Sequence, residues 1–539
     1  MKGNARTAFC LLLIFLAALS GFATGQGERR EAGKAAEEAA PPMDERGAAE
    51  ADKESLPPGF PIVEEPIVLH GFGRRDVAHG PWDRMLLWQE MERISNIHVE
   101  WETPGPSMVM ERLRYLLSTG ELPDFLIKSG IDPVDIVKYG PTGSFISLED
   151  LIEGHAPHLN ALLAEHPQWR KAITAPDGHI YYLPGIVDYP GIMTFRFPML
   201  NTAWLRKSGS SVPATTEELA QVLRSFRDRD MNGNGDPADE IPYSAHTMDY
   251  ALRAFLGSFG LDYQCRYWIS IQEEEPEITL TDPRFRELLR YFNLLYTEKL
   301  LDPEILTQNT ELYLGKLRDG RIGFTPLYDR LEAGSYAGQY EVIEPLAGPS
   351  GERGWRGMTK SAIGGKPAFV VTSANPYPAE TVRWIDTFYS YQGSVLLYLG
   401  VEGVTFEKKP DGSLDYLPRI YADQRGITRA QGDFTITPYG GEPGYYGDNP
   451  HWFPQTEVPR YYQVVKDFLP GYVYNQPMFD QADQERFSAL HSLVDAYWRE
   501  MRAKFVTGEA SLDLWSEYVR RMEKLGLREL EALYRDALE

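Results

Sequence analysis

The segment that decides the fold runs from Pro66 to Ile127; it begins Pro66-Ile67-Val68-Leu69 and ends Asp124-Phe125-Leu126-Ile127. Both ends are short apolar runs of the kind that form buried strands. Between them, Ile97, Val99 and Trp101 alternate with polar residues, which is typical of a strand with one buried face. The segment therefore contains three predicted strands.

Two predicted helices separate these strands. Pro81 to Ile94 begins with proline at a favoured first-turn position, and Met110, Leu113 and Leu117 lie on one face of a second helix that stops at Gly120. The order β, α, β, α, β predicts a parallel sheet covered by helices, and an α/β fold class.

Signals further along the chain predict more elements of the same kinds. Helices are predicted after Thr215, which forms a capping signature with Glu218, after Asp282, and from Pro378 onward. A strand is predicted at 321–324, and most of the last 60 residues are predicted to be helical.

Length and charge limit the possible classes. The chain has 539 residues, and at roughly 150 residues per domain more than one globular unit is expected. The formal net charge of -24 argues against nucleic acid as a partner, because phosphates need a basic surface.

The first residues are typical of a secretory signal, which we assign to residues 1–25. Lys2 and Arg6 precede an apolar run from residue 8 to 19, and small residues follow it. Residues 26–60 have the composition of a disordered linker. Cys10 lies too early for lipid attachment at the cleavage point, and only Cys265 remains after cleavage, so no internal disulfide is expected. We expect an exported, soluble protein in the periplasm or outside the cell.

A second informative stretch is Asp230-Met231-Asn232-Gly233-Asn234-Gly235-Asp236-Pro237-Ala238-Asp239-Glu240. Its oxygen-bearing side chains stand at alternate positions around a tight turn, as in loops that wrap Ca²⁺. The predicted ligands of a structural calcium ion are Asp230, Asn232, Asn234, Asp236, Asp239 and Glu240. The loop is not an EF-hand, because its last acids fall at positions 10 and 11 and position 12 is Ile241. A pair of Asn-Gly turns is the alternative.

Several segments carry a family resemblance in their order and spacing. They are Glu121-Leu122-Pro123-Asp124, Asp177 to Pro184, Asn201 to Leu205, the end of the acidic loop to Pro242, Leu300 to Glu304, Arg383 to Asp386, Gly400 to Gly403, and Phe505 to Gly508 with Trp515. Together they resemble the extracellular solute-binding proteins (family 1) of bacterial ABC importers, in the large oligosaccharide-binding branch common among lipoproteins.

The resemblance implies a type II periplasmic-binding-protein fold, in which two α/β lobes close over a ligand. We expect residues 61–195 plus about 366–420 to form the N-terminal lobe, and 196–365 plus about 421–539 the C-terminal lobe. The resemblance also implies calcium in the acidic loop, an oligosaccharide ligand and an ABC permease as partner. Most relatives carry a lipid-attachment motif that this chain lacks. We expect a monomer.

The resemblance to sugar receptors directs attention to aromatic and polar residues in loops. Sugars present apolar C–H faces and a rim of hydroxyls, and parallel α/β sheets bind ligands at the carboxyl ends of strands. The candidate binding residues are Arg74, Arg75, Trp82, Asp124, Trp204, Trp268, Trp355, Tyr446 and Trp452. The alternative for each is packing in the core or solvation at the surface. Trp384, Trp498 and Trp515 lie in helical patterns and are expected in the core.

Four arginines raise the question of ligand charge. Arg74, Arg75, Arg353 and Arg356 would hold the carboxylate of a uronic acid if they line the cleft. Solvated surface arginine is the alternative.

An enzyme is a competing class. The ten histidines show no metal-ligand spacing, and Pro157 separates His155 from His158. A secreted glycosidase or lyase that acts on the same polysaccharides stays open as an alternative, as does an oligopeptide receptor.

Overall fold

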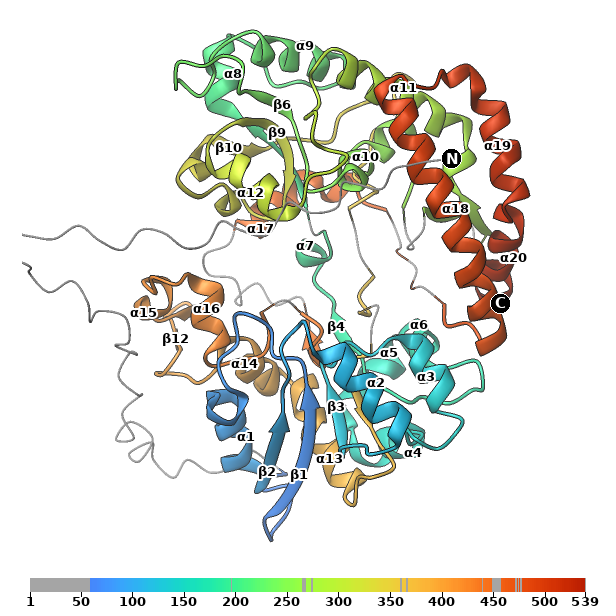
Figure 1. Ribbon diagram of the computed structural model, residues 1–539. Helices are drawn as coiled ribbons and strands as arrows, with labels where there is room; N and C mark the ends of the chain where they lie inside the picture. Colours follow the sequence, from blue (N-terminus) through green and yellow to red (C-terminus); the bar gives the residue numbers. More distant parts are fainter. Residues whose placement is uncertain are drawn as a thin grey trace, which may run out of the picture. The chain divides into compact units, whose positions relative to one another are not determined.

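The computed structural model describes residues 59–538 except 195, 264–267, 273–274, 359–360, 365–366, 439, 448–456, 471–472, 474 and 476. The predicted signal and linker, Cys265 and Trp452 therefore lie outside the described residues. The strands, drawn as arrows in Figure 1, are β1 Ile67–Gly73, β2 Ile97–Glu102, β3 Phe125–Ile127, β4 Gly185–Val187, β5 Phe197–Asn201, β6 Ile241–Tyr243, β7 Ile269–Gln272, β8 Glu275–Ile278, β9 Ile322–Leu327, β10 Tyr340–Val342, β11 Phe369–Val371, β12 Phe406–Lys408, β13 Leu414–Tyr416 and β14 Gly444–Tyr446.

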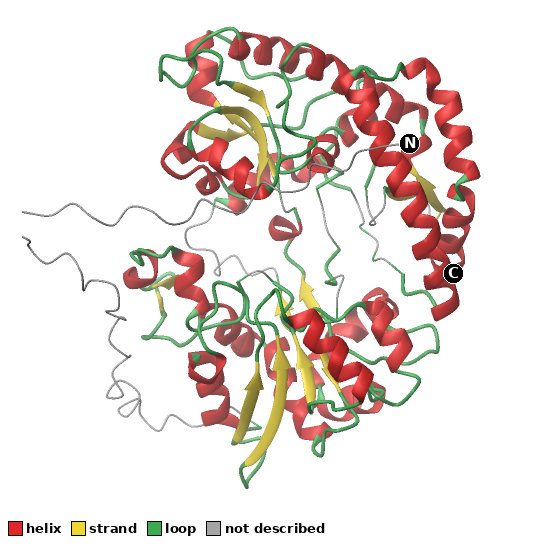
Figure 2. Ribbon diagram, viewed as in Figure 1, coloured by secondary structure: helices red, strands yellow, loops and turns green. Residues whose placement is uncertain are grey.

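Helices make up more of the described chain than strands do (Figure 2). They are α1 Leu86–Ser95, α2 Val109–Thr119, α3 Pro133–Tyr139, α4 Glu149–His155, α5 Pro157–Glu165, α6 Pro167–Ile173, α7 Pro190–Met193, α8 Thr202–Ser208, α9 Thr216–Arg227, α10 Met248–Arg253, α11 Pro283–Thr297, α12 Thr310–Arg318, α13 Pro378–Asp386, α14 Tyr391–Leu399, α15 Pro418–Tyr421, α16 Ile427–Gly432, α17 Val458–Val465, α18 Gln481–Thr507, α19 Trp515–Lys524 and α20 Leu527–Leu538. Short 3-10 turns include η1 Trp82–Arg84 and η4 Arg330–Gln339. Among these helices none is both long and apolar enough to cross a bilayer.

The first sheet has the strand order β11-β3-β1-β2. β1 runs parallel to β2 and to β3, which confirms the parallel sheet predicted from the sequence. β11 joins the edge antiparallel to β3, with Phe369 opposite Ile127. A strand that lies far downstream in the chain therefore completes this sheet, and local periodicity does not reveal it.

Two glycines in β1 make room for indole rings. A Cβ atom at Gly71 would lie 2.6 Å from the ring of Trp101, and one at Gly73 would lie 2.5 Å from the ring of Trp82. The two indoles meet edge to face with centroids 5.0 Å apart, and Trp88 stacks on Trp384 at 5.6 Å. The tryptophan rings thus pack directly against the backbone of β1 at two positions that have no side chain.

One predicted helix is divided in the structure. Pro81 to Ile94 forms η1 and α1, with extended backbone at Met85 between them. The amide of Leu87 donates to the carbonyl of Phe434 at 3.1 Å, and Gly80 donates to Gly432 at 2.9 Å. The bond from Leu87 to a distant segment thus replaces the bond that its N–H would make in a continuous helix. The predicted C-terminal helices are confirmed as α18, α19 and α20.

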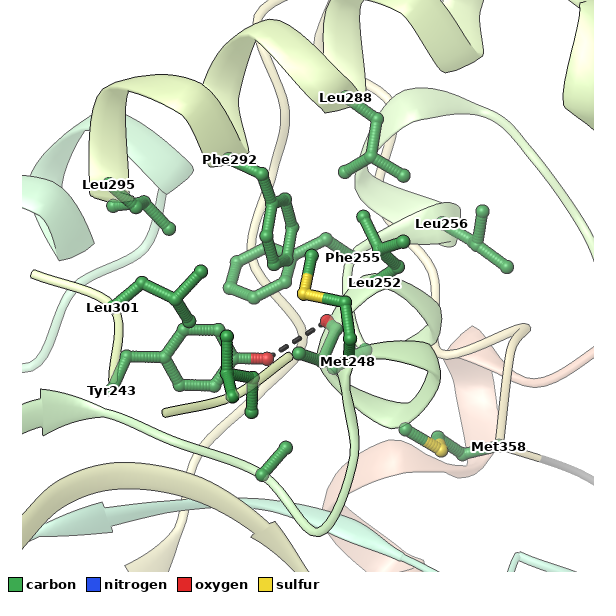
Figure 3. Packing of buried hydrophobic residues seen from close by; sticks show 14 of the residues in the cluster. Tyr243, Met248, Leu252, Phe255, Leu256, Leu288, Phe292, Leu295, Leu301 and Met358 are labelled. Atoms are coloured by element: carbon green, nitrogen blue, oxygen red, sulfur yellow. Dashed lines mark hydrogen bonds between the residues drawn. The ribbon is translucent and has the colours of Figure 1, made fainter. Parts of the chain in front are cut away.

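The second sheet has the order β10-β5-β9-β6. β5 is antiparallel to β9, with Phe197 opposite Leu327, whereas β6 is parallel to β9. Figure 3 shows the packing behind β6, where Tyr243 lies beside Phe255 and Phe292 and its hydroxyl donates to the carbonyl of Ala251 at 2.9 Å. Apolar side chains of α10 and α11 cover this strand.

Residues 57–539 form one compact unit, in which the buried apolar side chains fall into separate clusters. The first large cluster is drawn from residues 62–186, 362–397 and Ile436. The second is drawn from residues 197–358 and 458–534. β4 and β14 pair in parallel, and Ile186 of β4 also bridges to Ile363, so three distant segments lie side by side where the sequence passes between the clusters.

Candidate functional site

Charged side chains gather where β1 and β3 end. Arg74 and Asp76 follow β1, and the Nε atom of Arg74 lies 2.9 Å from an Asp76 carboxylate oxygen. Lys128 follows β3 directly and adopts a left-handed backbone with φ 48°. Because β1 and β3 are parallel neighbours, their carboxyl ends share one edge of the sheet. We call Arg74, Asp76, Lys128 and Glu442 the first strand-end cluster.

Lys128 is the centre of this cluster, and its side chain is only 1% exposed. Its ammonium donates to three backbone carbonyls, those of Ile436 at 2.8 Å, Pro438 at 2.9 Å and Gly440 at 2.6 Å. Asp76 lies 3.5 Å away and Glu442 lies 3.8 Å away. All three ammonium donors are used, so Lys128 ties the chain before β14 to the end of β3.

Burial shifts the pKa values in and beside this cluster. Burial lowers the pKa of Lys128 and raises that of Glu442. Burial also lowers the pKa of the neighbouring His79 to about 4, and the nearby Lys128 adds to this effect. The imidazole Nδ1 of His79 accepts the backbone N–H of Asp76 at 3.2 Å, so His79 is neutral at pH 7.

A second group lies at the matching end of the second sheet. His246 follows β6, and Arg196 precedes β5, which places it beside the carboxyl end of the antiparallel β9. Glu332 lies 3.3 Å from the Nε2 atom of His246 and 3.6 Å from Arg196. We call Arg196, His246 and Glu332 the second strand-end cluster. The pKa of Glu332, which burial alone would raise, is lowered by its hydrogen bond to His246 and by Arg196.

Aromatic rings border the second strand-end cluster. The Arg196 guanidinium lies 5.1 Å from the ring of the half-buried Tyr250, and His246 packs on Tyr313 with centroids 4.2 Å apart. Tyr328 follows β9 directly and is half-buried. Arg253 lies 3.9 Å from the ring of Tyr263 and donates to the carbonyl of Gly357 at 2.7 Å. This end of the sheet therefore offers rings and hydrogen-bonding groups together.

Most of the tryptophans proposed as ligand contacts are packing residues. Trp82 and Trp204 are each 1% exposed; Trp82 lies among the indoles on β1, and Trp204 packs edge to face on Phe226. Trp268 is wedged between Phe285 and Trp498, and the indole of Trp355 donates to the carbonyl of Arg196 at 2.7 Å. These four rings are therefore packing residues in this structure, because tertiary contacts cover them.

Tyr446 and Asp124 also have structural partners. The ring of Tyr446, 4% exposed, packs edge to face on Tyr398. Asp124 precedes β3, and its carboxylate accepts the backbone N–H of His70 at 2.6 Å. Asp124 thus joins β3 to β1 away from the carboxyl ends. Trp384, Trp498 and Trp515 lie in the core, as predicted from their helical spacing.

The arginines differ in their surroundings. Arg75 is exposed beside the first strand-end cluster. Arg353 donates to the exposed Glu344 at 2.6 Å, and Arg356 lies 3.6 Å from Asp262. Arg74 is about one-quarter exposed and faces Asp76. Of the predicted binding residues, the structure brings Arg74 and Arg75 to a strand end.

The acidic loop follows α9 and is built from side-chain-to-backbone hydrogen bonds. Asp230 accepts the N–H groups of Gly233 at 2.7 Å and Gly235 at 3.0 Å, and both glycines have positive φ. Asn232 and Asn234 each accept an N–H two residues ahead. The carboxylates and amide oxygens therefore point inward along a tight loop, as the alternate spacing predicts.

The late acids of the loop fold back over it. Glu240 accepts the N–H groups of Met231 at 2.6 Å and Asn232 at 3.1 Å, while its other oxygen is buried without a hydrogen-bond partner among the described residues. Asp239 accepts both asparagine amides and lies 3.2 Å from Arg321. Over the described ranges no three His, Cys, Asp or Glu side chains converge on one point, so a cation here also needs asparagine and backbone oxygens. The oxygen-only donor set and the orphaned Glu240 oxygen fit a hard cation.

One cavity lies apart from both strand-end clusters. It has a volume of about 280 Å³, lies between α1 and β2, and is lined by Trp88, Trp101 and Trp384 with acidic residues at its margin. None of the residues predicted to bind ligand lines it.

The sequence pattern did not single out Lys128, Arg196, Tyr250 or Tyr328. Lys128 and Tyr328 could have been found from the sequence, because each directly follows an apolar strand and ligands bind at the carboxyl ends of strands in α/β sheets. Arg196 precedes an antiparallel strand, so only the sheet topology places it at the same edge.

Comparisons with known proteins identify relatives over nearly the whole chain. No protein-family model matches. The fructooligosaccharide ABC transporter substrate-binding protein FusA of Streptococcus pneumoniae serotype 4 is 26% identical over 496 residues, which cover 88% of this chain and 90% of FusA. Solved structures of FusA with kestose and of a FusA EF-hand mutant with fructo-nystose match with TM-scores of 0.72 and 0.71 at 25% and 24% identity, each over 88% of this chain and 99% of the other.

Two further solved structures share the fold. The HMO-binding solute-binding protein of Bifidobacterium longum infantis matches with a TM-score of 0.75 at 20% identity, and the alginate-binding protein AlgQ2, solved without calcium ion, with 0.69 at 22%. Each covers 88% of this chain and 99% of the other.

Proposed function

We propose, from the premise that this chain belongs to the substrate-binding proteins of ABC transporters, that it captures an oligosaccharide and delivers it to a membrane permease. The observation that carries this proposal is the likeness to FusA, a fructooligosaccharide-binding protein, across 88% of this chain and 90% of FusA. The type II periplasmic-binding-protein fold agrees with that premise.

The two strand-end clusters are the proposed binding surfaces. Each lies at the carboxyl ends of parallel strands in its own sheet, which is where α/β sheets bind ligands. Arg74 and Arg75 supply donors at the first, and Tyr250, Tyr328 and Arg196 supply rings and donors at the second. A saccharide held by both would place ring faces on tyrosine and hydroxyls on charged groups.

We propose two lobes with one revised boundary. The carbonyls of Gly432 and Phe434 bond to residues before and in α1, and β14 pairs with β4. Residues from about 421 to 446 therefore belong with residues 61–195 rather than with the C-terminal lobe. The paired strands β4 and β14 and the segment at Ile363 are the proposed hinge.

We propose calcium as a structural ion in the acidic loop. Asp230, Asn232, Asn234, Asp236, Asp239 and Glu240 would hold it, and the ion would brace the turn between α9 and β6. Support comes from the loop's oxygen donors and from the fact that FusA has a solved EF-hand mutant. The ion supplies rigidity and takes no part in bond chemistry.

Export follows from the same proposal. Residues 1–25 have the composition of a secretory signal, and the proposed substrate reaches the permease from outside the cytoplasm. The protein is a transport receptor and not an enzyme, as its relatives are substrate-binding proteins of transporters. The glycosidase, lyase and oligopeptide alternatives receive no support from these relatives.

Calorimetry with fructo-oligosaccharides such as kestose and nystose tests the function. We expect saturable heat at one ligand per chain and an unchanged saccharide on subsequent chromatography. Release of shorter sugars, or binding of peptides in place of saccharides, would contradict the proposal.

A further inference from the structure

The positive charges at the first strand-end cluster already have carboxylate partners. Arg74 lies 2.9 Å from Asp76, and Lys128 lies 3.5 Å from Asp76 and 3.8 Å from Glu442. The ammonium of Lys128 also has its three donors on backbone carbonyls. Two cations and two acids share this cluster, and a ligand carboxylate would have to displace one of those acids.

The second strand-end cluster is balanced in the same way. Arg196 lies 3.6 Å from Glu332, and the same carboxylate accepts a hydrogen bond from His246. Asp329, whose carboxylate accepts the N–H of Leu331 at 2.9 Å, adds a second acid beside Tyr328. Arg353 and Arg356, the other predicted anion binders, face Glu344 and Asp262.

We infer that the ligand is an uncharged oligosaccharide and that uronic acid oligomers are rejected. This inference rests on the proposed function. A ligand carboxylate would meet Asp76 and Glu332 at short range, and the described cations of the two clusters, Arg74, Lys128 and Arg196, already face these acids. The exposed Arg75 beside the first cluster is in contact with water, so its charge offsets little of the cost of removing a ligand carboxylate from water. Hydroxyl groups donate to carboxylates and accept from guanidinium groups, so a paired cluster suits them. The net charge of -24 also repels anions at long range.

Matched neutral and acidic ligands test the inference. Nystose and an alginate tetrasaccharide have equal numbers of rings, and calorimetry at low and high salt measures each Kd. We expect nystose to bind with little salt dependence and the uronate to bind at least about 30-fold more weakly. Tighter binding of the uronate overturns the inference and leaves the function intact. Failure of every saccharide tested overturns the function and the inference together.

A single variant examines the physical cause. Glu332→Gln keeps an oxygen to accept the N–H of Tyr328, which lies 2.8 Å from Glu332, but removes the charge that faces Arg196. We expect uronate affinity relative to nystose to rise about tenfold. Glu344→Gln removes the acid beside Arg353 and is the matched control, for which the ratio stays unchanged. Thermal unfolding verifies that both variants are folded, and equal ratios in the two variants would overturn the explanation.

Discussion

At the scale of single residues, Lys128 shows what a sequence pattern can and cannot reveal. Its place after an apolar strand is visible in the sequence, but its carbonyl partners lie 308 to 312 residues further along. The tryptophans show that the absence of a helical pattern does not indicate exposure. Trp268 and Trp355 lie outside helical patterns, yet both are buried, because tertiary contacts cover loops as well as helices. Residue type and spacing therefore indicated that Arg74 and Arg75 lie at a strand end, but they did not reveal that these rings are buried.

Replacement of Lys128 should be costly. In Lys128→Met three backbone carbonyls lose their donor, Glu442 loses its nearby cation, and Asp76 keeps only Arg74. We expect the free energy of unfolding to fall by about 3 to 5 kcal/mol, measured by urea denaturation. The exposed Lys524→Met is the control and should change it by less than about 0.5 kcal/mol. Equal effects in the two variants would show that Lys128 does not stabilise the contact between the end of β3 and the chain before β14.

His79 should make stability depend on pH. Its folded pKa of about 4, lowered by burial, lies below the unfolded value of 6.5. The unfolded state therefore binds the proton more strongly, and stability is complete above about pH 6.5 and decreases as the pH falls toward 4. The same urea titrations at pH 7.5 and pH 5 measure the loss. For His79→Asn the free energy of unfolding should fall less between pH 7.5 and pH 5 than for the natural protein. An equal fall in both proteins would show that His79 does not cause the pH dependence.

At the scale of elements, helices and strands with strong local signals were predicted well. α9 begins after Thr215, whose hydroxyl accepts the N–H of Glu218 at 3.1 Å, and α11 begins at Pro283, directly after Asp282. β11 and the break at Met85 were not predictable, because both depend on pairing with distant segments. The loop at Asp230 lies between these cases, because its turns follow from the sequence but the partners of its last two acids do not. Glu240 accepts backbone N–H groups, and Asp239 accepts the side-chain amides of both asparagines.

Calcium should stabilise the loop measurably. At calcium concentrations of about 100 times Kd the folded state gains about 2.7 kcal/mol, so the Tm should rise and then fall when a chelator is added. Asp230→Asn weakens the donor set at the first loop position and should remove most of that rise. Asp513→Asn, an exposed acid outside the loop, serves as the control. If calcium does not change the Tm of the natural protein, the loop does not bind a structural calcium ion.

At the scale of the whole molecule, the fold class follows from the βαβαβ segment, but the division of the chain does not. The first large apolar cluster takes residues from 62–186 and again from 362–436. In the division that we propose, no change in composition marks residue 446 as the end of the first lobe. The support for placing residues 421–446 in that lobe comes from the hydrogen bonds of Gly432 and Phe434 and from the pairing of β14 with β4.

Two separate apolar clusters predict two steps in unfolding. Calorimetric scans without ligand should show two overlapping transitions, because each cluster is buried largely by its own residues. A saccharide held by both strand-end clusters should raise both midpoints and bring them together. A ligand that moves only one transition would place the site on one half alone.

The interleaving of the two clusters along the chain bears on how such a receptor can change over generations. Residues of the second cluster stand between the two stretches that build the first, and its own last members come from 458–534. A single crossover between the genes of two relatives, placed anywhere between these stretches, would leave at least one half with a mismatched interior. The halves are therefore inherited as a pair, and new ligand preferences have to arise by substitution at the strand ends.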